Sequence, residues 1–278
     1  FVTQEDIFDV IERLFKEVFS AIKKHDLKLP FQRMTYHEAM NNYGSDKPDL
    51  RFDMKLKDIS DITFKSEFEA FRKVKEDKGV VYGLVAPGCA SKSRKELEVW
   101  VEEVKKLRNL PLYWAKVENS TLQTGIAKFF DPELQKELIT YTSAKEGDLL
   151  LVVSGEWNKV ATSLGMLRKK LCSELKLIEE NQFKFLCVVD FPLFEYDEEE
   201  KKWLAMHHVF TKPQDKFLDN MEKDPGLVLG NLYDCVLNGT ELLSGSIRIN
   251  RPDVLKRILD IISMPEEEAE QKFGFFLR

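Results

Sequence analysis

Apolar residues at the start of the chain recur every three or four positions, a pattern that predicts an amphipathic helix. Thr3 can cap its first turn, with Asp6 three positions on as a variant of the capping box. The apolar positions are Ile7, Val10, Ile11, Leu14, Phe15, Val18 and Ile22. Such a helix needs a surface to pack against and nothing precedes it here, so we expect these residues to lie inside a larger domain.

The middle of the chain alternates strand-like and helix-like patterns. The predicted strands cover residues 79–88, 112–118 and 148–155. Ser93 with Glu96 forms a capping box at the start of one helix, and Asp131 followed by Pro132 opens a second. A third helix is expected from about 156 to 175. The alternation predicts a compact α+β unit of its own.

The expected organisation is one domain interrupted by another. A loop rich in turn formers, YGSDKPDLRF, separates the first helix from the middle unit. We place the interrupted domain at residues 1–62 and 181–278, and the inserted domain at residues 63–180.

After the middle unit the pattern changes to paired strands. The runs KFLCVVDFPLFEYD and KKWLAMHHVF are joined by an acidic turn at 197–200 and predict a long hairpin. On its second strand His207 and His208 are adjacent, so they would point to opposite faces. Two further strand-like runs follow, NLYDCVLNG and TELLSGSIRIN, and the chain closes with helices opened by Pro252 and Pro265.

Composition fits a soluble globular protein, with 43% hydrophobic and 32% charged residues among 278. No apolar run approaches the ~18 residues of a membrane span, so we expect no membrane partner. A net charge of −6 argues against a dedicated nucleic-acid-binding domain in this part, although it leaves room for a local basic edge. The cysteines are Cys89, Cys172, Cys187 and Cys235. They match no CxxC pattern, which is typical of small buried residues in a reducing, cytoplasmic compartment.

One set of charges stands out in the last third of the chain. Asp234, Glu241 and Arg248 are each seven positions apart. On an uninterrupted strand this odd spacing would send successive members to opposite faces. A turn or bulge at Asn238-Gly239, and another at Ser244-Gly245, would bring all three to one face.

The types of these charges indicate a chemistry if they converge. Two carboxylates can hold a Mg²⁺ ion that is also bound by phosphates, and an arginine takes a carboxylate in two parallel hydrogen bonds. The set would then bind Mg-ATP beside a small acidic substrate. From spacing alone, an exposed hairpin with ordinary surface charges is the alternative.

Six strings, spread in order over essentially the whole chain, carry a family resemblance: YGSDKPDLRF, VVDFPLFEYD, HHVFTKP, YDCVLNGTEL, GSIRI and EEEAEQKFGFFL. They resemble the bacterial-type aspartyl-tRNA synthetases. The resemblance implies an α+β fold, in which the antiparallel class II sheet with flanking helices is interrupted by a compact α+β insertion similar to the GAD domain. It also implies ATP-dependent attachment of aspartate to its tRNA through aspartyl-adenylate, with Mg²⁺, in a cytoplasmic homodimer.

The resemblance also assigns roles to residues of this sequence. Glu241 matches the glutamate that contacts ATP and its magnesium, and Asp234 matches a companion carboxylate at the metal. Arg248 matches the arginine that grips the side-chain carboxylate of aspartate, so Arg248 and Glu241 are the expected catalytic residues. His207 matches a histidine at the amino-acid pocket, and His208 is its neighbour. A structural role is an equally good interpretation of His208.

Three positions depart from the family pattern. Leu243 and Ser244 stand where glycines are usual, Val209 where proline is usual, and Asn250 where histidine is usual. Leu243 puts most in doubt, because glycines permit the close approach of a backbone to a ligand.

The resemblance does not include the anticodon-binding barrel or motifs one to three, so we expect an internal part of the enzyme that is inactive alone. The alternative is a non-catalytic, tRNA-facing accessory module related to the GAD domain of the tRNA-dependent amidotransferases. The segments FPLFEYD and ELLSGSIR favour the synthetase, since they match its active site. The sequence leaves open whether tRNA-Asn is charged as well as tRNA-Asp.

Overall fold

A computed structural model describes residues 2–277, and the side chains up to residue 274. Contacts divide the chain into two units: a first unit of residues 1–37 and 185–278, and a second unit of residues 38–184. Both combine helices with mainly antiparallel sheets, so the α+β prediction is confirmed.

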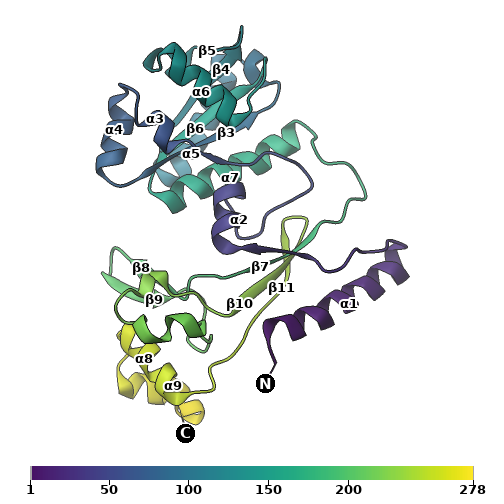
Figure 1. The fold of residues 1–278 in the computed structure, drawn as a ribbon, viewed down its shortest axis with the longest axis vertical. Coiled ribbons are helices and arrows are strands. Elements are labelled where there is room, and N and C mark those ends of the chain that lie inside the picture. The colour runs from purple at the N-terminus through teal and green to yellow at the C-terminus, as the bar shows by residue number, and fades with distance from the viewer. Residues whose placement is uncertain (1, 278) are drawn as a thin grey trace. The chain divides into compact units, whose positions relative to one another are not determined.

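The first unit is built on a four-stranded sheet in the order β1-β7-β10-β11 (Figure 1). The strands are β1 Gln32–Thr35, β7 Phe185–Val189, β10 Leu232–Leu237 and β11 Thr240–Ser246. β1 and β7 are parallel, and the other pairs are antiparallel. Helix α1, Gln4–Lys23, begins with the predicted capping box of Thr3 and Asp6. It packs on one face of the sheet, where Phe8 meets the Tyr233 ring edge-on at 5.1 Å.

Smaller elements complete the first unit. A two-stranded sheet pairs β8 Phe194–Asp197 with β9 Lys202–Ala205, and the helices are η3 Asp215–Asn220, η4 Pro225–Leu227, α8 Pro252–Ile261 and α9 Glu266–Leu277. The predicted long hairpin is therefore wrong, because its first run is split between two sheets. Asp190 has a left-handed φ of 56°, and Pro192 has no N–H to donate to a strand ladder. The chain leaves the main sheet between these residues and begins the short hairpin.

The second unit contains a five-stranded antiparallel sheet in the order β2-β3-β6-β4-β5. Its strands are β2 Lys57–Asp58, β3 Val80–Ala86, β4 Leu112–Glu118, β5 Thr121–Gln123 and β6 Leu149–Gly155. Its helices are α3 Ser60–Thr63, α4 Glu69–Glu76, η1 Cys89–Ser91, α5 Arg94–Arg108, η2 Gly125–Phe129, α6 Pro132–Thr142 and α7 Trp157–Glu174, and α2 Tyr36–Tyr43 crosses from the first unit. The predicted strands and helices of this unit are confirmed, including the caps at Ser93 and Asp131.

Both faces of this second sheet are buried. Along β6, Leu149 and Leu151 pack into a core with residues of α5 and α7, while Leu150 and Val152 pack into a second core with residues of α6. Successive side chains on a strand point to opposite faces, so this one apolar strand supplies both cores. The second unit is therefore a three-layer arrangement around β6 (Figure 1).

The contact units do not coincide with the domain limits expected from the sequence. Residues 38–62 belong to the second unit, since Leu56, Ile59 and Ile62 are buried in its two cores. The short strand β2 also pairs there, with β3. Turn formers hide this segment from a periodicity analysis, because its apolar residues make no regular pattern. The independent domain at 63–180 stays a prediction.

The four cysteines are buried and free, as expected. Among residues 2–277, none of the helices combines the length and apolar character needed to cross a bilayer.

Candidate functional site

The candidate site is built on the hairpin of β10 and β11. Its two-residue turn is Asn238-Gly239, where φ is 54° and 81°. Left-handed φ at both central residues is the conformation that a tight hairpin turn requires, and asparagine and glycine adopt it most readily. The turn places Glu241 directly opposite Val236, two positions along the same strand face from Asp234. Asp234 and Glu241 therefore share a face of the sheet.

A bulge in β11 brings the rest of the site to this face. The register shifts between Cys235 and Val236, so that Ser244 pairs with Asp234 and Ser246 with Leu232. The extra residue is Leu242, and the strand then alternates normally. The turn at Asn238-Gly239 was predicted correctly, but the expected bulge at Ser244-Gly245 lies instead at Leu242.

Gly245 allows a side chain to pack on the opposite face of the hairpin. It pairs with Tyr233, and a Cβ atom at this position would lie 2.5 Å from the Tyr233 hydroxyl oxygen. The glycine therefore lets the Tyr233 ring lie flat over β11, where it also meets Phe8 of α1. Close backbone approach is needed here for a packed aromatic ring.

The two histidines follow β9 in a bend, so the prediction that they lie on a strand is wrong. They still point different ways. The ring of His207 meets that of Phe191 edge-on at 5.3 Å, whereas His208 contacts Arg248. His208 is therefore joined to the predicted substrate arginine.

Arg248 lies just beyond β11 and is held there by its backbone and by one nitrogen. It bridges to Thr211, and its Nη1 lies 2.6 Å from Nε2 and 3.1 Å from Nδ1 of His208. Within the described residues the guanidinium is exposed, forms no ion pair, and makes no hydrogen bond through Nε or Nη2. The Nε–Nη2 side of the fork is thus open to a carboxylate.

His208 is neutral at pH 7 in this setting. Burial lowers its pKa, and the nearby charges of Arg248 and His207 lower the pKa further. Ser246 Oγ lies 3.2 Å from Nε2, a contact that the sequence prediction missed. The available signal was the alternation of Ser244, Ser246 and Arg248 at every second position, which places them together after the bulge.

Asp234 and Glu241 differ in exposure. Asp234 is only 3% exposed, whereas Glu241 is exposed near the hairpin turn. The described residues contain no cluster of three or more His, Cys, Asp or Glu side chains that could hold a metal alone. The two carboxylates have the hard oxygen donors that Mg²⁺ prefers, and they suit an ion whose other ligands are phosphate oxygens and water.

Of the positions that depart from the family pattern, Ser244 lies on this face, opposite Asp234, whereas Leu243 does not. Leu243 pairs with Cys235, so its side chain points to the opposite face of the hairpin. Val209 packs against two apolar clusters of the first unit, and Asn250 is exposed shortly before α8. The doubt over Leu243 therefore does not extend to the carboxylates, because its side chain is not on their side.

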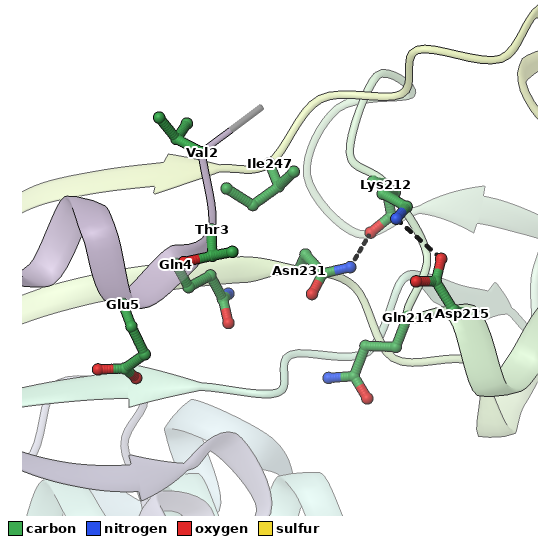
Figure 2. Close-up of a pocket in the computed structure, with 9 residues that line it drawn as sticks. All are labelled: Val2, Thr3, Gln4, Glu5, Lys212, Gln214, Asp215, Asn231 and Ile247. Atoms are coloured by element: carbon green, nitrogen blue, oxygen red, sulfur yellow. Dashed lines mark hydrogen bonds and ion pairs between the residues drawn. The ribbon is translucent and has the colours of Figure 1, made fainter.

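A separate cavity of about 380 Å³ lies in the first unit (Figure 2). It is lined by Val2, Thr3, Gln4, Glu5, Lys212, Gln214, Asp215, Asn231 and Ile247. Lys212 is paired with Asp215 at 2.8 Å, and the Asn231 amide donates to the Lys212 carbonyl at 3.2 Å. Ile247 alternates with Ser246 and Arg248, so the cavity belongs to the other face and is not part of the candidate site.

Comparison with known proteins identifies the family of the chain. The aspartate–tRNA(Asp/Asn) ligase of Caldanaerobacter subterraneus is 43% identical over 277 residues, and the aspartate–tRNA ligases of Macrococcus caseolyticus and Halalkalibacterium halodurans are 43% and 44% identical over 278. Each alignment covers 100% of this chain but 47% of the relative, so the chain spans about half the length of these relatives. All of residues 1–278 match the family described as tRNA synthetases class II (D, K and N). The chain therefore belongs to the class II tRNA synthetases of the D, K and N type.

Proposed function

We propose that the full-length protein is an aspartate–tRNA ligase and that this chain supplies its aspartate-binding arginine. The observation that carries the proposal is the open Nε–Nη2 side of Arg248, which contacts His208 together with Ser246, a residue on the same hairpin face as Asp234 and Glu241. A carboxylate accepts two parallel hydrogen bonds from such a fork. The names of the relatives support aspartate as the substrate.

The reaction proposed has two steps. The α-carboxylate of aspartate attacks the α-phosphate of ATP to form aspartyl-adenylate and release pyrophosphate. The aspartyl group then passes to the terminal adenosine of the tRNA, and AMP leaves. The nucleophile is already ionised, so no general base is required for the first step. The contribution of the protein is positioning and charge stabilisation.

Each site residue has a role in this reaction. Arg248 binds the side-chain carboxylate of aspartate and so leaves the α-carboxylate free to react. Glu241 and Asp234 would hold a Mg²⁺ ion bound to ATP, which neutralises phosphate charge when present. His208 is neutral and adds no second positive charge beside Arg248. His207, whose ring packs on Phe191, borders the amino-acid pocket.

The proposed partners are aspartate, ATP with Mg²⁺ and tRNA, and the proposed assembly is a homodimer of the full-length protein. An accessory, non-catalytic role is less well supported, because the family match extends over residues 185–278, which include Arg248 and both carboxylates. Relatives are named both as aspartate–tRNA ligase and as aspartate–tRNA(Asp/Asn) ligase, so either tRNA specificity is compatible with the proposal.

Aspartate-dependent ATP–pyrophosphate exchange by the full-length protein tests the proposal. Arg248→Ala should lower kcat/KM for aspartate about 10²- to 10³-fold with little change in the KM for ATP, since an unpaired charge costs a few kcal/mol. Arg248→Lys should remain strongly impaired because it loses the fork. Arg251→Ala is the matched control, an exposed arginine paired with Asp253.

Two outcomes would contradict the proposal. One is the absence of aspartate-dependent exchange in the unmodified full-length protein. The other is an equal loss for aspartate and ATP in Arg248→Ala accompanied by a lowered Tm, which would make Arg248 a structural residue. The 278-residue chain alone should give background exchange only.

A further inference from the structure

Another cavity, of about 490 Å³, lies entirely within the second unit. Three of the residues that line it are lysines, namely Lys55, Lys57 and Lys145. Among the described residues, none of the three is held in an ion pair with a carboxylate. Like charges that share a cavity repel one another, so an anion bound between them would be stabilised.

The backbone directs these lysines to the cavity from two distant segments. The chain that leads into β2 alternates between buried and solvent-facing side chains. Met54 and Leu56 are buried in the core, so Lys55 and Lys57 point to the other side. Lys145 comes from the turn that follows α6. The fold therefore brings together cations that lie almost 90 positions apart in the sequence.

Two carboxylates also line the cavity, and they differ in what they leave for a ligand. Asp148 is 9% exposed, and its oxygens accept hydrogen bonds from the backbone N–H groups of Gly88 at 3.0 Å and Lys145 at 2.9 Å. Asp53 is exposed. A ligand would thus meet three ammonium groups and one exposed carboxylate. This local excess of positive charge favours an anion, although the whole chain has a net charge of −6.

The end of α6 explains only one of the three lysines. Ser143 is the C-cap of this helix, and Lys145 lies two positions beyond it, where a cation offsets the partial negative charge of the helix end. Lys55 and Lys57 belong to a segment that ends no helix. Their convergence on the cavity therefore needs another reason.

We propose that this cavity binds a phosphate group. The lysine ammonium binds phosphate as a point charge, and three such groups can share the oxygens of one phosphate or pyrophosphate. None of the side chains lining the cavity has an aromatic ring on which a base could stack. The ligand is therefore recognised through its phosphate, which is either free in solution or part of an RNA backbone. The inference does not rest on the function proposed for Arg248.

Equilibrium dialysis of the full-length protein with ³²P-pyrophosphate tests the free ligand. The double variant Lys55→Ala, Lys57→Ala should bind one pyrophosphate fewer per chain than the unmodified protein, and binding at the catalytic site cancels in this comparison. The double variant Lys55→Arg, Lys57→Arg keeps both charges and should bind as the unmodified protein does. The matched control is Lys95→Ala, Lys106→Ala, which removes two exposed lysines of α5 outside the cavity.

Filter binding of tRNA by the same variants tests the other source. If the phosphate belongs to an RNA backbone, Lys55→Ala, Lys57→Ala should leave the pyrophosphate count unchanged and raise the Kd for tRNA about tenfold. It should also reduce the slope of log K against log salt concentration by about one to two. The control pair should leave the Kd for tRNA close to that of the unmodified protein.

The inference is overturned if Lys55→Ala, Lys57→Ala changes neither the pyrophosphate count nor the Kd for tRNA. An equal loss in the control pair also overturns it, because that result reflects net charge rather than a site. Lys145→Ala is an independent variant from the other segment, and it must weaken the same ligand. Failure of the proposed function has a different signature, namely no aspartate-dependent exchange by the unmodified protein, whatever the dialysis and tRNA binding show.

Discussion

Arg168 in the second unit and Arg248 in the first are held in opposite ways. Arg168 is 1% exposed, and it donates to the carbonyls of Met54, Asp49 and Phe52 at 2.8–2.9 Å. Its guanidinium lies over the rings of Phe52 and Tyr43, 3.8 and 4.9 Å from their centroids. Arg248 is exposed, and one of its nitrogens contacts His208.

The difference separates a structural cation from one available to a ligand. Burial lowers the pKa of Arg168 to about 10, so it stays charged at neutral pH, and its bonds to three carbonyls fix the loop at 49–54. Removing Arg168 would leave buried carbonyl groups without a hydrogen-bond donor. Removing Arg248 leaves no group of comparable burial without a partner, so we expect its loss to weaken aspartate binding rather than to lower the free energy of unfolding.

The two units also differ in how completely they bury their apolar side chains. The second unit buries the apolar side chains of its sheet on both faces. In the first unit, α1 buries Phe8 but leaves Val10, Leu14, Val18 and Ile22 between 39% and 71% exposed. We therefore expect the second unit to be the more stable of the two on its own, and the limits of that unit provide the strongest test.

The largest expected change in stability comes from shortening the second unit at its N-terminal end. A fragment of residues 38–184 should melt cooperatively, whereas one of residues 63–180 lacks the buried Leu56, Ile59 and Ile62. Each buried aliphatic side chain contributes about 1.5–3 kcal/mol, so the shorter fragment should lose about 5 kcal/mol or more. Urea unfolding followed by circular dichroism measures the difference. Equal stability would restore the limits expected from the sequence.

Arg168→Ala should follow, with a loss of about 3–5 kcal/mol in the free energy of unfolding of the 38–184 fragment. Arg168→Lys keeps the charge but cannot reach three carbonyls in one plane, so it should recover only part of the loss. Arg94→Ala, which removes an exposed pair with Glu98, is the matched control and should change stability by less than about 0.5 kcal/mol. A neutral effect of Arg168→Ala would refute its structural role.

Gly245→Ala should destabilise the first unit by about 1–3 kcal/mol, because the new methyl group meets the Tyr233 ring. Thermal melts of the full-length protein measure this loss. The same substitution in a Tyr233→Leu background should cost less, since the ring that it meets is gone. An equal cost in both backgrounds would exclude the clash as its cause.

The smallest effect concerns pH. The pKa of His208 is lowered in the folded protein by burial, then by Arg248 and His207, so the unfolded state binds its proton first as the pH falls. His208 therefore leaves stability intact above its unfolded pKa of about 6.5 and reduces it as the pH falls from there through the folded pKa. Melts at pH 7.5 and 5.5 should show a smaller pH-dependent loss in His208→Gln. An identical loss would contradict a neutral His208.

Local signals predicted most of the second unit. Capping residues such as Ser93 and Asp131 act within their own helix, and the apolar strand at 149–155 is identified by its composition alone. The contacts of the segment at 38–62 are with the second unit, which a periodicity analysis does not indicate, because its few apolar residues form no regular pattern and are identified only by the cores in which they are buried.

The site was predicted where turn chemistry decides the geometry. Asn238-Gly239 specifies a tight turn, and this turn is enough to bring Glu241 and Asp234 to one face. No glycine at Leu242 predicts the bulge there, because the bulge depends on the pairing of β11 with β10. The contact of His208 with Arg248 joins residues 40 positions apart and depends on a bend that interrupts the predicted strand.

The most direct test of the account measures binding and stability together in the full-length protein. Isothermal titration with L-aspartate and a thermal melt would be carried out on Arg248→Ala and Arg168→Ala. The account predicts that Arg248→Ala loses measurable aspartate binding at an unchanged Tm, whereas Arg168→Ala lowers the Tm and binds aspartate with an unchanged Kd below that temperature. Aspartate binding by Arg248→Ala with the Kd of the unmodified protein would contradict it.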